Sequence, residues 1–171
     1  MSLFVKDTES FADFNKTINT YQNENISIYL LDYMMNYQHL SDFITSDFVA
    51  FFGTEHFYGR NYLKDLMLAT IYTDADFIGK NYYFKASGDK LVDSSEGSEY
   101  QFTANLNSSS SVLRTHYPFK KELTALIHEF TAGIELSNYM KQGAKMFSSD
   151  KYNFIQNGKD AKETWIRGIE I

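Results

Sequence analysis

The sequence predicts a single α+β domain, and three observations support this. The chain has 171 residues, which suits one domain able to bury about two-thirds of the surface that its unfolded form exposes. It contains no cysteine, so neither a disulfide framework nor a thiolate metal site can form. Segments with helical spacing of apolar residues occur beside segments in which polar and apolar residues alternate. We therefore expect helices and strands around one core.

Charge and hydropathy argue against a membrane, exported or nucleic-acid-binding protein. The apolar runs are far shorter than the roughly 20 residues of a membrane helix, and the N-terminus lacks the layout of a signal peptide. We expect a cytoplasmic protein without membrane contact. The net charge is -6 and the basic residues are scattered, so we expect no direct nucleic-acid contact by this segment. Tyr, Phe and Trp make up 17% of the chain, and we expect most of them to fill the core, a ligand pocket being the alternative.

The N-terminal segment predicts one helix over residues 7–22, with Asp7 or Thr8 as its N-cap. Its apolar stripe consists of Phe11, Phe14, Ile18 and Tyr21. The polar residues 23–25 then end the helix.

A hairpin is predicted next, from a strand over residues 26–35, a turn at Asn36 and a second strand over residues 37–44. A single helix over the same stretch is the alternative. Residues 47–52 predict a short helix that ends on Gly53.

The middle of the chain predicts two helices, over residues 61–72 and 75–85, the second capped by Thr73 or Asp74. The first should turn Leu63, Leu66, Met67 and Ile71 inward. The second should bury Phe77, Ile78, Tyr82 and Phe84. Residues 87–98 are rich in Gly, Ser and Asp and predict a loop.

The C-terminal half predicts mainly strands. Alternation at Tyr100, Phe102 and Ala104, and again over residues 112–119, indicates two strands joined by a serine turn. Residues 123–136 suit a helix and a strand equally. Residues 152–156 and 164–171, with Asn157 and Gly158 between them, predict a hairpin.

Taken in order, these segments resemble the PAS family. The motifs are IYLLDYMMNYQHLSDFI as the opening hairpin, FVAFFG as the short helix, EHFYGRNYLKDLMLATIYTDADF as the helical part, and YQFTANL, SVLRTHYPFK and ALIHEFTAGIELSNYMK as the closing strands. Within IYTDADF, Ile71 and Asp76 match a PAS element whose His and Pro are missing, and the usual closing aspartate is absent from GIELS. The resemblance covers about residues 26–166.

The resemblance implies a five-stranded antiparallel sheet with short helices on one face, an N-terminal helix and a C-terminal hairpin extension. Residues 123–136 would then be a strand. It divides the chain into an N-terminal helical cap (1–25), a PAS-like domain (26–140) and a C-terminal β-hairpin extension packed on the same domain (141–171).

The match is closest to PAS domains that precede a LuxR-type helix-turn-helix, and KYNFIQNGKDAKETWI is similar to the stretch that follows them. This implies a sensory or dimerisation domain of a bacterial transcription regulator, a homodimer that binds a small ligand or a partner. The N-terminal helix is the expected dimer contact. A DNA-binding domain would follow Ile171 in a longer protein.

Known catalytic and metal motifs are incomplete, so we predict no catalytic residues, no metal site and no identified cofactor-binding residues. His128 and Glu129 begin a zinc-protease signature, but Ala132 stands where the second His is required. Asp74 and Asp76 resemble the start of a calcium loop without its glycine and its closing glutamate. Gly53 and Gly59 form no phosphate loop, because no Gly-Lys-Ser/Thr follows.

The four histidines are His39, His56, His116 and His128. His56 is the nearest candidate for an axial haem ligand, although we do not expect haem. A cysteinyl flavin is excluded by composition, and no nucleophile elbow presents a serine. We therefore expect a protein that is not an enzyme and has no evident cofactor, a small-molecule ligand of unknown identity in the PAS pocket being the alternative.

Two alternatives come from other classes. An NTF2-like ligand-binding protein or enzyme is suggested by SDFVAFFGTEHFYGR, and would make residues 48–52 a strand rather than a helix. An acidic, Tyr-rich interaction or inhibitor module that binds a basic partner is the other, and should lack an internal cavity.

Overall fold

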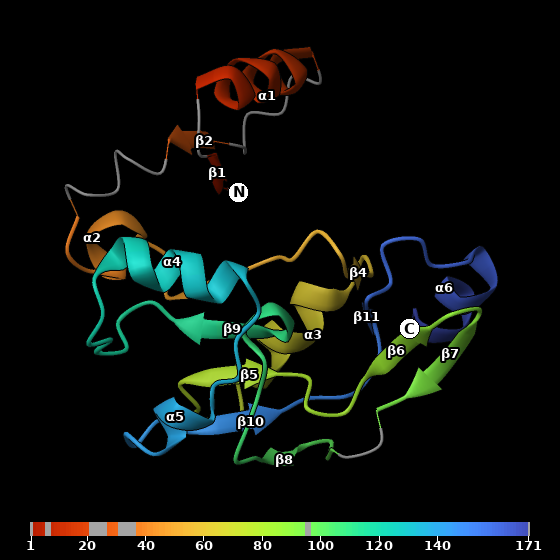
Figure 1. The fold of residues 1–171 in the computed structure, drawn as a ribbon. Coiled ribbons are helices and arrows are strands. Elements are labelled where there is room, and N and C mark those ends of the chain that lie inside the picture. The colour runs from red at the N-terminus through yellow and green to blue at the C-terminus, as the bar shows by residue number, and fades with distance from the viewer. Residues whose placement is uncertain (1, 6–7, 21–26, 31–36, 95–96, 171) are drawn as a thin grey trace.

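The computed structural model describes residues 2–5, 8–20, 27–30, 37–94 and 97–170 (Figure 1). The helices are α1 (Thr8–Thr20), α2 (Leu40–Phe43), α3 (Tyr62–Ala69), α4 (Leu123–Thr131), α5 (Ser137–Met140) and α6 (Glu163–Ile169), with a 3₁₀ turn at Ser108–Ser110. The strands are β1 (Ser2–Val5), β2 (Ser27–Leu30), β3 (Phe48–Ala50), β4 (Phe57–Tyr58), β5 (Phe77–Gly79), β6 (Phe84–Ser87), β7 (Lys90–Asp93), β8 (Gln101–Phe102), β9 (Ser111–Arg114), β10 (Met146–Ser148) and β11 (Phe154–Gln156). The α+β class is confirmed.

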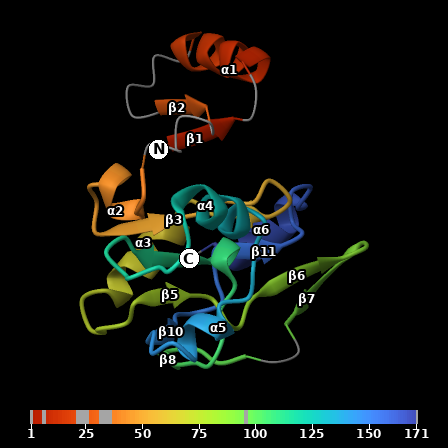
Figure 2. The ribbon, with the colours of Figure 1, turned by 60° about the vertical axis from the view of Figure 1, so that its left-hand side comes forward.

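The strands form two mixed sheets and a separate pair. The larger sheet has the order β3-β9-β5-β10-β8, and the smaller one has the order β4-β11-β6-β7. β1 and β2 pair in parallel and lie with α1 at one end of the molecule (Figure 2). Among the described helices, none is long and apolar enough to cross a bilayer.

The larger sheet is buried on both faces. Phe77, Leu113 and Met146 point toward α4 and α5, whereas Ile78, Val112 and Phe147 point toward α3. Because successive side chains of a strand point to opposite faces, a strand covered on both sides is apolar throughout and shows no alternation. This explains why the sequence indicates no strand at β5.

Aromatic rings fill the α4 side of this sheet, as the composition predicts. Phe77, Tyr117, Phe119, Phe130 and Tyr139 contact one another with ring centroids 4.9–6.2 Å apart. Most of these contacts are edge-to-face, the geometry that the ring quadrupoles favour.

The predicted opening hairpin is wrong in its second half. β2 falls within the predicted first strand, but it pairs with β1, and residues 31–36 lie outside the described chain. Where the second strand was expected, Leu40–Phe43 forms α2, capped by a hydrogen bond from the His39 amide to Asp42. The N-terminal helix is confirmed as α1.

Five other predictions are corrected. The expected loop at 87–98 contains β7, which pairs antiparallel with β6. The expected helix at 47–52 is β3, held by antiparallel pairing with β9; here the NTF2-like alternative was right about one element. The expected helix at 75–85 contains β5 and the start of β6. Residues 123–136 begin with helix α4, because helical spacing buries Leu123, Leu126, Ile127 and Phe130 together. The expected last strand, 164–171, is largely α6, while β11 confirms the strand before it.

The PAS arrangement is not confirmed. β5 and β10 run in parallel at the centre of the larger sheet, so the sheet is not antiparallel throughout. Helices cover both faces of the sheet rather than one, with α4 and α5 opposite α3. No terminal hairpin is formed, because β11 pairs with β4 and β6 instead of with the residues of α6.

Candidate functional site

His56 belongs to a polar cluster that holds loops together. Its Nδ1 accepts a hydrogen bond from the Asn157 amide at 3.1 Å, and its Nε2 lies 3.1 Å from Ser109 Oγ. Since Nδ1 accepts, the proton sits on Nε2, and the imidazole donates to Ser109 instead of taking its proton. Ser109 Oγ in turn donates to Asn107 Oδ1 at 2.7 Å. The pair therefore resembles a nucleophile and its base but has the wrong tautomer.

Burial lowers the pKa of His56, against the opposing effect of the Glu55 carboxylate. With both ring nitrogens engaged, His56 has no free nitrogen for haem iron. The other histidines, His39, His116 and His128, are exposed. His39 borders an open pocket of about 500 Å³ together with Lys120 and Lys121.

The remaining sequence candidates are structural. Asp74 forms an ion pair with Lys145, and Asp76 accepts a hydrogen bond from the Lys145 amide at 2.9 Å. Gly53 donates to Tyr58 Oη, and Gly59 donates to the Asn153 carbonyl. In the part of the chain that the structure describes, no three His, Asp or Glu side chains converge as metal ligands.

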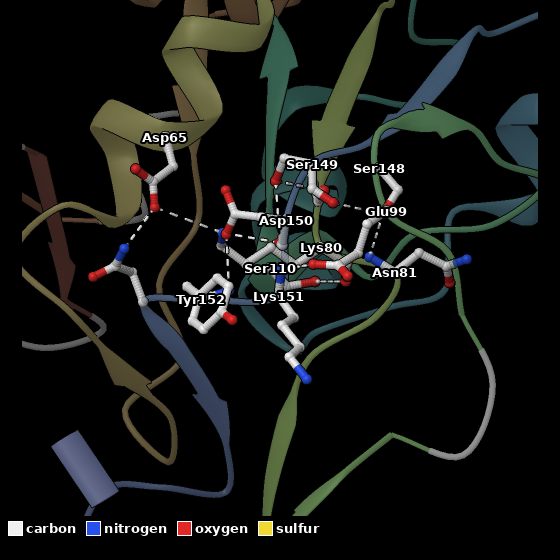
Figure 3. A network of polar contacts seen from close by, with 12 residues as sticks. Asp65, Lys80, Asn81, Glu99, Ser110, Ser148, Ser149, Asp150, Lys151 and Tyr152 are labelled. Atoms are coloured by element: carbon white, nitrogen blue, oxygen red, sulfur yellow. Dashed lines mark hydrogen bonds and ion pairs between the residues drawn. The ribbon is translucent and has the colours of Figure 1, made fainter. Parts of the chain in front are cut away.

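A buried ion-pair network lies where the two parallel strands end. Lys80 follows β5 and Asp150 follows β10, and their side chains meet at 2.9 Å (Figure 3). The Lys80 ammonium also donates to the Asp150 carbonyl at 3.1 Å, and its side chain is fully buried. Ligands of α/β sheets commonly bind outside the carboxyl ends of parallel strands. The location alone makes this network a candidate site.

The backbone fixes this network tightly. The Lys80 amide donates to the Ser110 carbonyl at 3.0 Å, and the Ser149 amide donates to the Gly79 carbonyl at 2.8 Å. Gly79 is required here because a Cβ at this position would lie 2.1 Å from Ser111 Oγ. Asp150 is oriented by the Tyr152 amide, which donates to its Oδ1 at 2.8 Å.

A second carboxylate reaches the same ammonium from α3. Asp65 Oδ2 lies 3.9 Å from Lys80 Nζ and accepts a 2.6 Å hydrogen bond from the side-chain Nδ2 of Asn153. Two carboxylates therefore share one ammonium. Burial raises the pKa of Asp65, which the Asn153 hydrogen bond and the Lys80 charge oppose. Burial lowers the pKa of Lys80, and Asp150 opposes that shift most strongly.

A surface pocket of about 310 Å³ opens above the network. Its lining consists of Asp65, Leu68, Ile71, Tyr72, Tyr100, Ser149 and Asp150. Both carboxylates thus reach the pocket while their shared lysine stays covered beneath. The Lys80 ammonium cannot contact a ligand without rearrangement, which removes it as a catalytic group.

Tyr100 stands at the mouth of this pocket in an unfavourable backbone conformation. Its φ of 53° is in the left-handed region, which bulky side chains rarely adopt. The pKa of Tyr100 is raised by burial and by nearby negative charges, those of Asp150 and Glu99 foremost. The pKa of Tyr72 is raised by burial and by Asp150. Both phenol groups therefore share the surroundings of one carboxylate.

The pocket lies within a wider apolar surface, which we call the α3 face. Its members are Leu68, Ile71, Tyr72, Tyr100 and Phe102, all exposed. The surface is continuous, since the pocket joins Leu68 and Ile71 to the two tyrosines, and Tyr72 and Phe102 both pack edge-on against Phe147. Ile71 and Tyr100 are 80% and 64% exposed. Contiguous apolar patches of this kind mark binding surfaces, whereas single exposed apolar residues do not.

The sequence reasoning missed this site. It placed Leu63, Met67 and Ile71 in the core, whereas α3 buries Tyr62, Leu66 and Ala69. One available signal was a charged residue close behind a short apolar run: Lys80 directly follows FIG in DFIGK, and Asp150 follows MF after two serines in MFSSD. Such a residue sits where a buried strand leaves the sheet.

The comparisons with known proteins add no further constraint. No protein-family model, curated protein or solved structure matches the chain.

Proposed function

We propose that this chain is a non-catalytic interaction module that binds a partner protein through its α3 face. The observation that carries the proposal is the continuous exposed apolar surface around a partly acidic pocket. The two-turn helix α3 packs on this side of the larger sheet together with residues of β4 and β11, and the apolar residues beside the helix stay exposed. Covering them would add burial at roughly 25 cal/mol per Å² of apolar surface.

The chemistry of the pocket agrees with binding rather than catalysis. The Lys80 ammonium is covered beneath the pocket. Outside the pocket, Ser109 accepts the hydrogen bond from the His56 imidazole, so this pair does not activate a serine nucleophile. Aromatic side chains such as Tyr72 and Tyr100 are typical anchors of protein interfaces.

A selection from a random peptide library, without assumption about sequence, tests this proposal. We expect peptides that bind the chain, lose binding to the Ile71→Glu variant and keep it with Met140→Glu. Met140 is the matched control, because it is exposed and apolar but lies on α5, on the opposite face of the sheet. No selected binders, or binders that tolerate Ile71→Glu, would contradict the proposal.

A sensory role is the second candidate, and the pocket itself favours it. Its volume of about 310 Å³ is at the lower end of small-ligand sites, and it lies at the carboxyl ends of β5 and β10. A regulator that signals through such a site would bind the ligand with different affinity in two states. Thermal denaturation with a panel of metabolites tests this: a ligand should raise the midpoint of the wild type but not of Tyr100→Ala.

A further inference from the structure

We propose that the partner presents a basic, amphipathic segment, and that one of its Lys or Arg side chains enters the pocket between Tyr72 and Tyr100 to meet Asp65 and Asp150. This inference rests on the proposed interaction through the α3 face. It adds the chemistry of the partner.

The charges of the pocket are incompletely balanced. Lys80 is the one ammonium within 4.0 Å of Asp65 and Asp150 among the described residues. The hydrogen bonds to Asp150 all fall on Oδ1, and the hydrogen bond to Asp65 falls on Oδ2. Each carboxylate keeps one oxygen without a partner in the described chain, and in Figure 3 that oxygen of Asp150 points away from Lys80. A second cation in the pocket would therefore find a free acceptor on Asp150 and a further negative charge on Asp65.

Aromatic side chains at the mouth of the pocket also suit a cation. Tyr72 and Tyr100 both line it, beside Asp65 and Asp150. A cation near the face of a tyrosine ring is attracted by the ring quadrupole. The aliphatic stem of Lys or Arg would meanwhile contact Leu68 and Ile71.

Charge complementarity selects a basic partner over a second copy of the chain. A symmetric dimer places the same patch of both subunits together, so Asp65 and Asp150 of one copy would face those of the other. The chain carries a net charge of -6, which adds to that repulsion. Lys64 is the one cation on the exposed side of α3, and it already lowers the pKa of Asp65.

The experiment uses three synthetic peptides and fluorescence anisotropy. The first combines leucine and lysine in an amphipathic pattern, the second replaces every lysine with glutamate, and the third replaces every leucine with serine. We expect saturable binding of the first peptide only. Its affinity should fall as the salt concentration rises, because the ion pairs are partly exposed.

Four variants locate the interaction. Asp65→Asn and Tyr100→Ala should each lower the affinity for the leucine–lysine peptide at least fivefold. Asp47→Asn and Met140→Glu should change its affinity less than twofold. Asp47 is an exposed carboxylate at the start of β3, which lies at the opposite edge of the sheet from β8. Circular dichroism checks that every variant is folded.

Four results would overturn the inference. Equal binding of the glutamate peptide would show that charge is irrelevant, and an equal effect of Asp47→Asn would show that only net charge matters. Concentration-dependent dimerisation of the chain abolished by Ile71→Glu would assign the face to a second copy. If selected library peptides require Ile71 but contain no basic residue, the interaction role stands and this inference fails.

Discussion

Lys80 is the residue on which the architecture of the site depends most. Its ammonium is fully buried and lies between the ends of β5 and β10 and the carboxylate from α3. Removing one partner of a buried ion pair leaves an unpaired charge, which is far more destabilising than losing an exposed pair. The same residue therefore fixes the floor of the pocket and the position of α3.

We expect Lys80→Met to lower the free energy of unfolding by about 3–5 kcal/mol, because two carboxylates remain buried together. Lys162→Met is the matched control. Lys162 and Asp89 also lie 2.9 Å apart, but their side chains are exposed, so the loss should stay below about 1 kcal/mol. Urea denaturation measures both, and equal losses would contradict a structural role for the buried network.

The left-handed backbone at Tyr100 should make the folded protein less stable than it would be with a residue that adopts this conformation readily. We attribute the presence of tyrosine there to its role in binding. Asn adopts the left-handed region more readily than Tyr, and the Tyr100 side chain is mostly exposed. Tyr100→Asn should leave the free energy of unfolding unchanged or raise it by up to about 1 kcal/mol. The same substitution should lower the affinity for the leucine–lysine peptide. A loss above about 1 kcal/mol in chemical denaturation would instead make Tyr100 a packing residue.

Among the elements, α3 shows most clearly what could and could not be predicted from the sequence. Its existence follows from helical spacing over residues 61–72, and the observed helix falls within that range. Its orientation does not, because apolar residues surround the helix on most sides and periodicity cannot choose between them. The ion pair of Asp65 with Lys80 and its hydrogen bond from Asn153 determine which side of α3 faces the core.

This orientation predicts unequal effects of two truncations. Leu66→Ala should destabilise the protein by about 2–5 kcal/mol, because Leu66 is fully buried against Ile78 and Val112. Ile71→Ala should change stability by less than about 0.5 kcal/mol, since its side chain is 80% exposed. Thermal or urea denaturation compares the two variants. A large loss of stability for Ile71→Ala would show that Ile71 faces the core, as the sequence predicted.

Across the whole molecule, sequence patterns predicted local elements better than topology. The α+β class, α1, α3, β9 and β11 could be read from periodicity and turn residues. The sheet order could not, because β5 is a three-residue strand buried on both faces and paired in parallel with a segment almost 70 residues away. Pairing between segments so far apart produces no pattern in the local sequence. The site where β5 and β10 end could not be predicted for the same reason.

The pH dependence of stability should include a contribution from His56. Burial lowers its folded-state pKa below the usual value near 6.5, so between these two values the unfolded chain binds the additional proton. The His56 contribution to stability should therefore be lost as the pH decreases below about 6.5. His56→Gln should flatten this decline, and parallel curves for the two proteins in urea titrations would show that His56 does not contribute.

The central claim, that the α3 face is the binding surface, is tested most directly by mapping a bound peptide by NMR. Titration of the ¹⁵N-labelled chain with the leucine–lysine peptide should shift the amide signals of residues 62–72, 99–102 and 147–151. The signals of α4 and α5, on the opposite side of the sheet, should stay in place. Shifts concentrated on α4 and α5, or none at saturating peptide, would contradict the account.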